Sequence, residues 1–185
     1  MKRSKRTIEE EAQALLDELQ IRTIPVPLDK IARALGARVS YAPLDEELSG
    51  MVFVKDAVPI VGVNSLHHSN RQRFTLAHEI AHLRLHRDEI TQAVHVDKRF
   101  AETVLRRDHR SSTGTDEREV EANQFAAALL MPRVRLLEAL EQIELDIEDE
   151  EALADLARIF KVSKATLQYR IRNLAPELRG LTPRP

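Results

Sequence analysis

The sequence predicts an α+β fold, in which a small antiparallel sheet packs on helices and the C-terminal part is helical. Two apolar-rich runs between Gly50 and Val63, separated by Lys55–Val58, are typical of a β-hairpin. Apolar residues at helical spacing indicate two long helices, at about 72–85 and 116–131. With 185 residues, 43% of them hydrophobic, the chain is long enough for one domain or for one domain with a small appendage.

The N-terminal part is expected to lead into the sheet through two helices. An amphipathic pattern predicts the first helix over Ile8–Gln20. The stretch Ile24–Val39 then contains a proline-punctuated loop, a short helix that ends at Gly36, and a strand. The hairpin follows, and the polar residues 65–70 precede a central helix over Gln72–Leu85.

The second half of the chain is expected to be mainly helical. Residues Arg87–Glu117 are polar and poorly periodic, with one possible strand at 102–107. The next helix is predicted to stop at Pro132, because proline breaks the helical hydrogen bonding, and two or three further helices reach Leu174. We therefore divide the chain into a core of residues 1–135 and a C-terminal helical segment of residues 136–185 that packs on it.

The composition excludes some functions. The formal charge of −2 gives no electrostatic reason to expect a nucleic-acid or membrane partner, and no apolar run is long enough to span a bilayer. The chain has no cysteine, so any zinc must be held by nitrogen and oxygen, and a reducing cytoplasm is the expected location. The basic residues Met1–Arg6 are expected to form a solvated, frayed end.

Residues 73–86, RFTLAHEIAHLRLH, place titratable side chains on one arc of an otherwise apolar helix. At about 100° per residue, His82 lies about 40° and Glu79 about 100° from His78. Two imidazoles one turn apart can bind one tetrahedral cation. This is the HExxH arrangement of zinc hydrolases, with His78 and His82 as ligands and Glu79 as the catalytic base. The alternative is an ordinary polar stripe at the exposed edge of an amphipathic helix.

A catalytic zinc site needs a third protein ligand, and the sequence nearby does not supply one. A metzincin-type extension would require glycine and histidine where this chain has Leu85 and Asp88. His86 lies about 12 Å from His78 along the helix axis, too far to share the metal easily. We expect His86 to pack, or to form a hydrogen bond near the site.

The next helix offers a better candidate. Glu119 falls within its apolar face, whereas Glu117 and Glu121 look away from that face. An unpaired carboxylate in an apolar interface is costly, so we predict that Glu119 is the third ligand and that zinc binding does not need Glu121. Asn123, on the border of the face, is expected to hold a ligating histidine in its tautomer. The alternative for Glu119 is a buried salt bridge with an arginine such as Arg73.

The segment Glu150–Leu174 is typical of a helix-turn-helix. Three cationic residues of its second helix could contact the phosphates of DNA: Lys164, Arg170 and Arg172. The alternative is that the apolar residues of the segment simply pack on the catalytic unit.

Several stretches together resemble the ImmA/IrrE family of zinc metallopeptidases. They are RQRFTLAHEIAHLRLH and EVEANQFAAALLMP, with IPVPLDKIARALGARV and LSGMVFV upstream, and the resemblance covers roughly Glu10–Leu174. It implies a zincin-like unit with a sheet of about three strands and a gluzincin-like site. It also implies that His78, His82 and Glu119 are zinc ligands and that Glu79 is the catalytic acid/base.

The resemblance further implies an endopeptidase that acts on a helix-turn-helix repressor of the Cro/cI type, often encoded nearby, and relieves repression in stress responses. An extended substrate is expected to add a strand along an exposed edge of the Gly50–Val63 hairpin. The oxyanion donor stays open among Tyr41, His109, Tyr169 and an arginine. The competing function is a non-proteolytic zinc protein that binds a repressor or toxin, but the complete HExxH motif with Glu119 favours the enzyme. The sequence does not indicate the oligomeric state.

Overall fold

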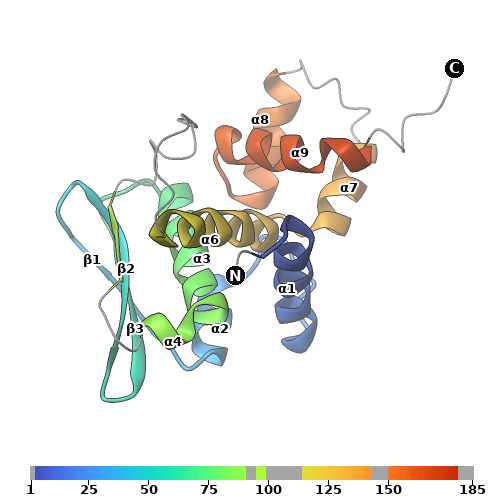
Figure 1. Cartoon of the computed structure of the whole chain (residues 1–185). Helices are drawn as coiled ribbons and strands as arrows, with labels where there is room; N and C mark the ends of the chain where they lie inside the picture. Colours follow the sequence, from blue (N-terminus) through green and yellow to red (C-terminus); the bar gives the residue numbers. More distant parts are fainter. Residues whose placement is uncertain (1–2, 91–94, 99–113, 143–149, 179–185) are drawn as a thin grey trace, which may run out of the picture.

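The computed structural model of the protein describes residues 3–90, 95–98, 114–142 and 150–178, and it confirms the α+β class (Figure 1). The sheet lies to one side of a group of helices. The elements run in the order α1 (Lys5–Glu18), α2 (Leu28–Ala34), β1 (Arg38–Ala42), β2 (Leu48–Lys55), β3 (Val58–Asn64), α3 (Ser69–Leu85), α4 (Arg87–Ile90), β4 (His95–Lys98), α6 (Gly114–Leu130), α7 (Arg133–Gln142), α8 (Glu150–Phe160) and α9 (Lys164–Leu178).

The predicted hairpin is formed by β2 and β3. Its turn residues Asp56 and Ala57 both have positive φ angles, of 51° and 63°, as a tight hairpin turn of the primed type requires. Neither hairpin strand lies at an edge of the sheet, whose strand order is β1-β3-β2-β4. The sequence predicted that a substrate adds a strand along an exposed edge of this hairpin. This prediction is wrong for Leu48–Val52 of β2, because β4 already pairs with these residues.

Two details of the sheet differ from the prediction of about three antiparallel strands. The described residues include a fourth strand, β4, and β1 pairs with β3 in parallel, so that the sheet is mixed. Strand order depends on pairings between distant segments, which local sequence patterns do not encode. β4 lies in the polar, poorly periodic stretch, where alternation gave no signal. The strand expected at 102–107 falls outside the described residues.

The core is built around α3 and α6, which pack against each other, while α3 also packs on β2 and β3. α3 is longer than predicted at its start, where the ring of His68 accepts a hydrogen bond from the backbone N–H of Asn70 at 3.2 Å. α6 ends at Leu130, just before Pro132, as predicted. Both helices are buried on almost every side, which is why a narrow amphipathic pattern is absent from them.

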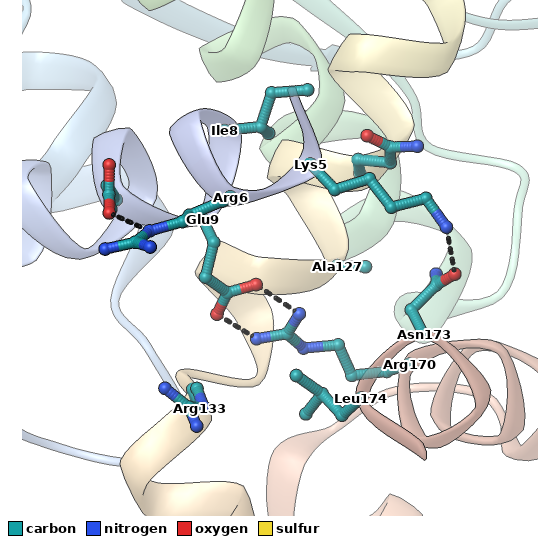
Figure 2. A pocket seen from close by; sticks show the side chains of 11 residues that line it. Lys5, Arg6, Ile8, Glu9, Ala127, Arg133, Arg170, Asn173 and Leu174 are labelled. Atoms are coloured by element: carbon teal, nitrogen blue, oxygen red, sulfur yellow. Dashed lines mark hydrogen bonds and ion pairs between the residues drawn. The ribbon is translucent and has the colours of Figure 1, made fainter. Parts of the chain in front are cut away.

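The C-terminal helix α9 is joined to α1 by a partly buried ion pair (Figure 2). The Arg170 guanidinium on α9 donates two hydrogen bonds to the Glu9 carboxylate on α1, and its Nε–H donates to the Met131 carbonyl at 3.1 Å. A cavity of about 640 Å³ lies beside this pair, lined by parts of α1, α6 and α9. The division of the chain at residue 135 stays a prediction.

Arg170 therefore does not fit the predicted contact with DNA phosphates. Its side chain lies on the inner face of α9, only 4% exposed, and its hydrogen bonds are used within the fold. Lys164 and Arg172 are exposed, and Lys164 forms an ion pair with Glu150. Contact of these two residues with nucleic acid stays a prediction. Among the described helices, none has the length and apolar character to cross a bilayer.

The hairpin approaches α3 most closely at Gly50. A methyl group at this position would lie 2.4 Å from Thr75 Cγ2, 2.9 Å from the carbonyl oxygen of Gly62 and 3.3 Å from Glu79 Oε1. The register between β2 and β4 also shifts between Leu48 and Gly50, which marks an irregularity beside α3. Only glycine leaves room for the strand to pack directly over the Glu79 carboxylate.

We predict that Gly50→Ala lowers the free energy of unfolding by about 1–3 kcal/mol, because the added methyl group meets backbone and a β-branched side chain that cannot yield. Gly62→Ala is the matched control, since its methyl group would meet only the flexible Met51 side chain at 3.2 Å. Urea denaturation of the two variants measures the difference. Equal losses would contradict the close approach at Gly50.

We also predict that Arg170→Met lowers the free energy of unfolding by about 1–3 kcal/mol, because Glu9 and the Met131 carbonyl lose their donor. The exposed neighbour Arg172→Met should change it by less than about 0.5 kcal/mol. Chemical denaturation monitored by circular dichroism compares the two. A similar small effect for both variants would refute a structural role for the Arg170 pair.

Candidate metal centre

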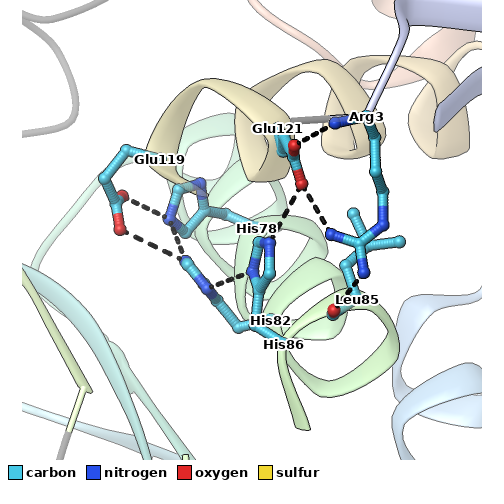
Figure 3. A network of polar contacts seen from close by, with 7 residues as sticks. All are labelled: Arg3, His78, His82, Leu85, His86, Glu119 and Glu121. Atoms are coloured by element: carbon cyan, nitrogen blue, oxygen red, sulfur yellow. Dashed lines mark hydrogen bonds and ion pairs between the residues drawn. The ribbon is translucent and has the colours of Figure 1, made fainter. Parts of the chain in front are cut away.

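Two helices bring together the three residues predicted to bind metal (Figure 3). His78 and His82 lie one turn apart on α3, and Glu119 reaches them from the first half of α6. Glu119 Oε2 is 3.1 Å from His78 Nε2, Glu119 Oε1 is 3.5 Å from His82 Nε2, and the two Nε2 atoms are 3.0 Å apart. Within the described part of the chain, these three residues form a group that could hold a metal ion.

The spacing of the donor atoms suits a single small cation. Donors bound at about 2.0–2.2 Å around a tetrahedral ion lie roughly 3.3 Å from one another. The three observed separations, from 3.0 to 3.5 Å, surround that value. The two imidazoles are almost completely buried, whereas 25% of the Glu119 side chain is exposed. Solvent therefore reaches the group from the side of the carboxylate.

The hydrogen bond of His78 fixes which of its nitrogens faces the group. Its Nδ1 lies 2.9 Å from Asn123 Oδ1, which can only accept, so Nδ1 carries the hydrogen. In the neutral ring, Nε2 then presents a lone pair to His82 and Glu119. This contact agrees with the position predicted for Asn123, and its role in holding the tautomer stays a prediction.

His86 contacts the Nδ1 atom of His82, as Asn123 contacts that of His78. Its Nδ1 is 3.1 Å from His82 Nδ1, and its Nε2 is 3.2 Å from Glu121 Oε2. Burial lowers the pKa of His86, despite the opposing effect of Glu121. Because a carboxylate accepts, His86 Nε2 donates to it, and in the neutral ring this leaves His86 Nδ1 to accept from His82 Nδ1. The Nε2 atom of His82 therefore also presents a lone pair.

These assignments make three electron-pair donors converge on one point. Two imidazole lone pairs and a carboxylate within 3.5 Å of each other repel unless a positive charge lies between them. A proton on one nitrogen can relieve only part of this repulsion, whereas a divalent cation satisfies all three donors. The chemistry of the donors thus fits a bound metal.

Glu79 occupies the other flank of α3, against the hairpin. Its side chain is fully buried, beside Gly50 and one turn after Thr75. The hydroxyl of Thr75 is also buried and has no hydrogen-bond partner among the described residues. Glu79 thus lies next in sequence to His78, and its carboxylate lies against Gly50 of β2.

Two residues of this region were not predicted from the sequence: Glu121 and Arg3. Glu121 was predicted to look away from the interface, but it is buried and bonded to His86. Ala128, two turns farther along the same face of α6 as Glu121, is also buried. A side chain that points away from Glu119 therefore does not have to face solvent. Arg3, expected in a solvated end, donates hydrogen bonds to Glu121. The run of alanines at 126–128 was the available signal that α6 is covered on several faces.

Other predicted partners lie elsewhere. The Arg73 guanidinium donates to the Val26 carbonyl at 3.0 Å, so Glu119 does not form the alternative salt bridge with it. The Tyr41 hydroxyl donates to Asp29, and burial together with the Asp29 charge raises the pKa of Tyr41 to about 12. Tyr169 packs against the hydrophobic core, and His109 lies outside the described residues. The oxyanion donor therefore stays unassigned.

We predict that Glu119→Ala lowers the affinity for Zn²⁺ by more than about 100-fold. Losing a residue that only hydrogen-bonds to a metal ligand costs about 10- to 100-fold, and Glu119 is proposed to bind the metal directly. Glu117→Ala is the control, since Glu117 is exposed on the same helix. Competition with a chromophoric chelator measures both affinities. Equal affinities for the two variants would remove Glu119 from the ligand set.

Comparisons with known proteins show the family and the fold of the chain. The family model of peptidase M78, described as the IrrE N-terminal-like domain, matches residues 32–172. A solved structure of a Mycobacterium tuberculosis transcriptional regulator superposes with a TM-score of 0.63 at 22% identity, over 89% of this chain and 46% of that one, which shows a shared fold. The chain thus spans about half the length of that regulator. A comparison with curated proteins finds no match. Because the family model covers most of the sequence, the chain belongs to the peptidase M78 family of IrrE N-terminal-like domains.

Proposed function

We propose that the protein is a zinc-dependent endopeptidase that cleaves a helix-turn-helix transcriptional repressor and so relieves repression. The observation that carries the proposal is the convergence of His78 Nε2, His82 Nε2 and a Glu119 carboxylate oxygen, with Glu79 buried on the same helix. A protein that only binds a partner would need the ligands but would not need a glutamate beside them. Membership of the M78 family supports a metallopeptidase-like domain linked to transcription regulation.

The proposed chemistry divides the work among the chain's own residues. Zinc, when held by His78, His82 and Glu119, would supply a Lewis acid that polarises the scissile carbonyl and makes water more acidic. Glu79 takes a proton from the attacking water and delivers it to the leaving amine. Asn123 and His86 keep the two rings oriented, so that their Nε2 lone pairs remain available.

A transcriptional repressor is proposed as the substrate for two reasons. The M78 family model is linked to transcription regulation, and the structure of similar fold is that of a transcriptional regulator. A repressor of the Cro/cI type encoded nearby would place the reaction in the cytoplasm. The burial of Arg170 makes the alternative, direct binding of DNA by the C-terminal helices, less well supported, because one of its three proposed cations is taken up within the fold.

We predict that Glu79→Gln retains zinc but loses about 10²- to 10⁴-fold in the rate of cleavage, because only the proton transfer is removed. The assay incubates the protein and zinc with the helix-turn-helix repressor encoded nearby and follows fragments by mass spectrometry, with zinc content measured in parallel. Glu117→Gln, an exposed change on α6, should cleave like the unchanged protein.

The same assay separates the enzyme from a non-proteolytic partner protein. Zinc-dependent fragments that disappear in Glu79→Gln support hydrolysis. Stable association with an intact repressor, identical for the unchanged protein and for Glu79→Gln, would overturn the endopeptidase proposal and leave the binding function.

A further inference from the structure

A continuous chain of polar contacts leads from His82 to the segment before α1 (Figure 3). It passes from His82 to His86, from His86 to Glu121 on α6, and from Glu121 to Arg3. Arg3 is separated from Glu121 by 118 positions in the sequence. The chain thus connects a proposed metal ligand with a residue that would otherwise be considered part of a frayed end.

Arg3 holds Glu121 by two separate groups. Its backbone N–H donates to Glu121 Oε1 at 2.7 Å, and its guanidinium donates to Oε2 at 2.7 Å. The second guanidinium nitrogen donates to the carbonyl oxygen of Leu85, the last residue of α3, also at 2.7 Å. Arg3 therefore joins the C-terminal end of α3 to α6, in a position where a helix end favours a cation.

These contacts keep the Glu121 carboxylate fixed. Its Oε1 accepts from the backbone N–H of Arg3, and its Oε2 lies 2.7 Å from the Arg3 guanidinium and 3.2 Å from His86 Nε2. The side chain is only 5% exposed, so water does little to hold it in place. A carboxylate paired with a guanidinium accepts hydrogen bonds, and this property sets the direction of every donor that follows it.

We infer that Arg3 and Glu121 are positioning residues for the metal centre: by fixing the acceptor for His86, they fix the hydrogen on His82 Nδ1 and aim the Nε2 lone pair at the cation. This inference rests on the proposed metal site, but it concerns metal affinity and does not require that the protein hydrolyse a peptide. The order of the segment before α1 is accordingly linked to the occupancy of the site.

The charge of Arg3 and its positioning role predict opposite effects of its removal on metal affinity. Removing a positive charge near a bound cation reduces repulsion and should tighten metal binding. If Arg3 instead acts through Glu121 and His86, its removal should weaken binding, because His82 loses its fixed tautomer and orientation. The direction of the change thus distinguishes the two mechanisms.

The experiment measures the affinity of the full chain for Zn²⁺ by competition with a chromophoric chelator, and the visible absorption of the Co²⁺-loaded protein. Arg3→Met should weaken Zn²⁺ binding by roughly 3- to 10-fold, at or below the lower end for outer partners of metal ligands, because the backbone N–H of residue 3 remains. Arg3→Lys should recover part of the loss. The Co²⁺ bands should shift in Arg3→Met, since ligand geometry changes.

Arg6→Met is the matched control. It removes one positive charge from the same segment, but Arg6 is largely exposed and pairs with Glu10. Its Zn²⁺ affinity should stay within about twofold of the unchanged protein, as for most surface changes. Thermal unfolding of each variant verifies that the fold is retained; Arg3 is 36% exposed, so its replacement leaves the core intact.

A double variant provides a second, independent measurement. From the sequence alone, Glu121 was expected not to matter for zinc binding, and its contact with His86 reverses that expectation. Glu121→Ala should weaken Zn²⁺ binding by about 10-fold or more, and adding Arg3→Met to it should cause no further loss, because both residues act through the same contact. Additive losses would overturn the inference, as would an unchanged or tighter affinity for Arg3→Met alone. Failure of the unchanged protein to bind Zn²⁺ would overturn the proposed metal centre itself. That outcome is distinguishable from the two outcomes that overturn the positioning role alone.

Discussion

The packing of α3 against α6 is the constraint on which the proposed centre depends. Both imidazoles stand on α3 and the carboxylate stands on α6, so the distance between the helices sets the spacing of the three donor atoms. Small residues such as Ala122 and Ala126 allow the two helices to approach closely while remaining buried. The donors are therefore brought together by the apolar core, and the entropy of ordering them is lost during folding rather than on binding a ligand.

The parts of this arrangement that sequence patterns could predict are those encoded locally or by one face of a helix. The hairpin turn, the HExxH spacing and the position of Glu119 on its helix all follow from periodicity. The parallel pairing of β1 with β3 could not be inferred, because strand order depends on contacts between distant segments. Glu121 was misjudged because a helical wheel gives the direction of a side chain but not what covers it. Arg3 was misjudged because its partners lie far away in the sequence.

Helix α1 and the residue before it contact three other helices: α3, α6 and α9. Arg3, just before α1, donates hydrogen bonds to Glu121 on α6 and to the Leu85 carbonyl at the end of α3. Glu9, in the first half of α1, accepts hydrogen bonds from Arg170 of α9. The family model begins at residue 32, so α1 lies outside the matched region. A helix outside the region matched by the family model thus contacts α3, α6 and α9, and ion pairs contribute to these contacts beside apolar packing.

The location of Arg3 has a practical consequence for making the protein in quantity. An affinity tag or fusion partner attached ahead of residue 1 would be joined within two residues of a side chain and a backbone N–H that both contact Glu121. Crowding there would act on the contacts behind His82 without altering any ligand. A tag should accordingly be kept away from Arg3, or be removed, before the metal content of the purified protein is measured.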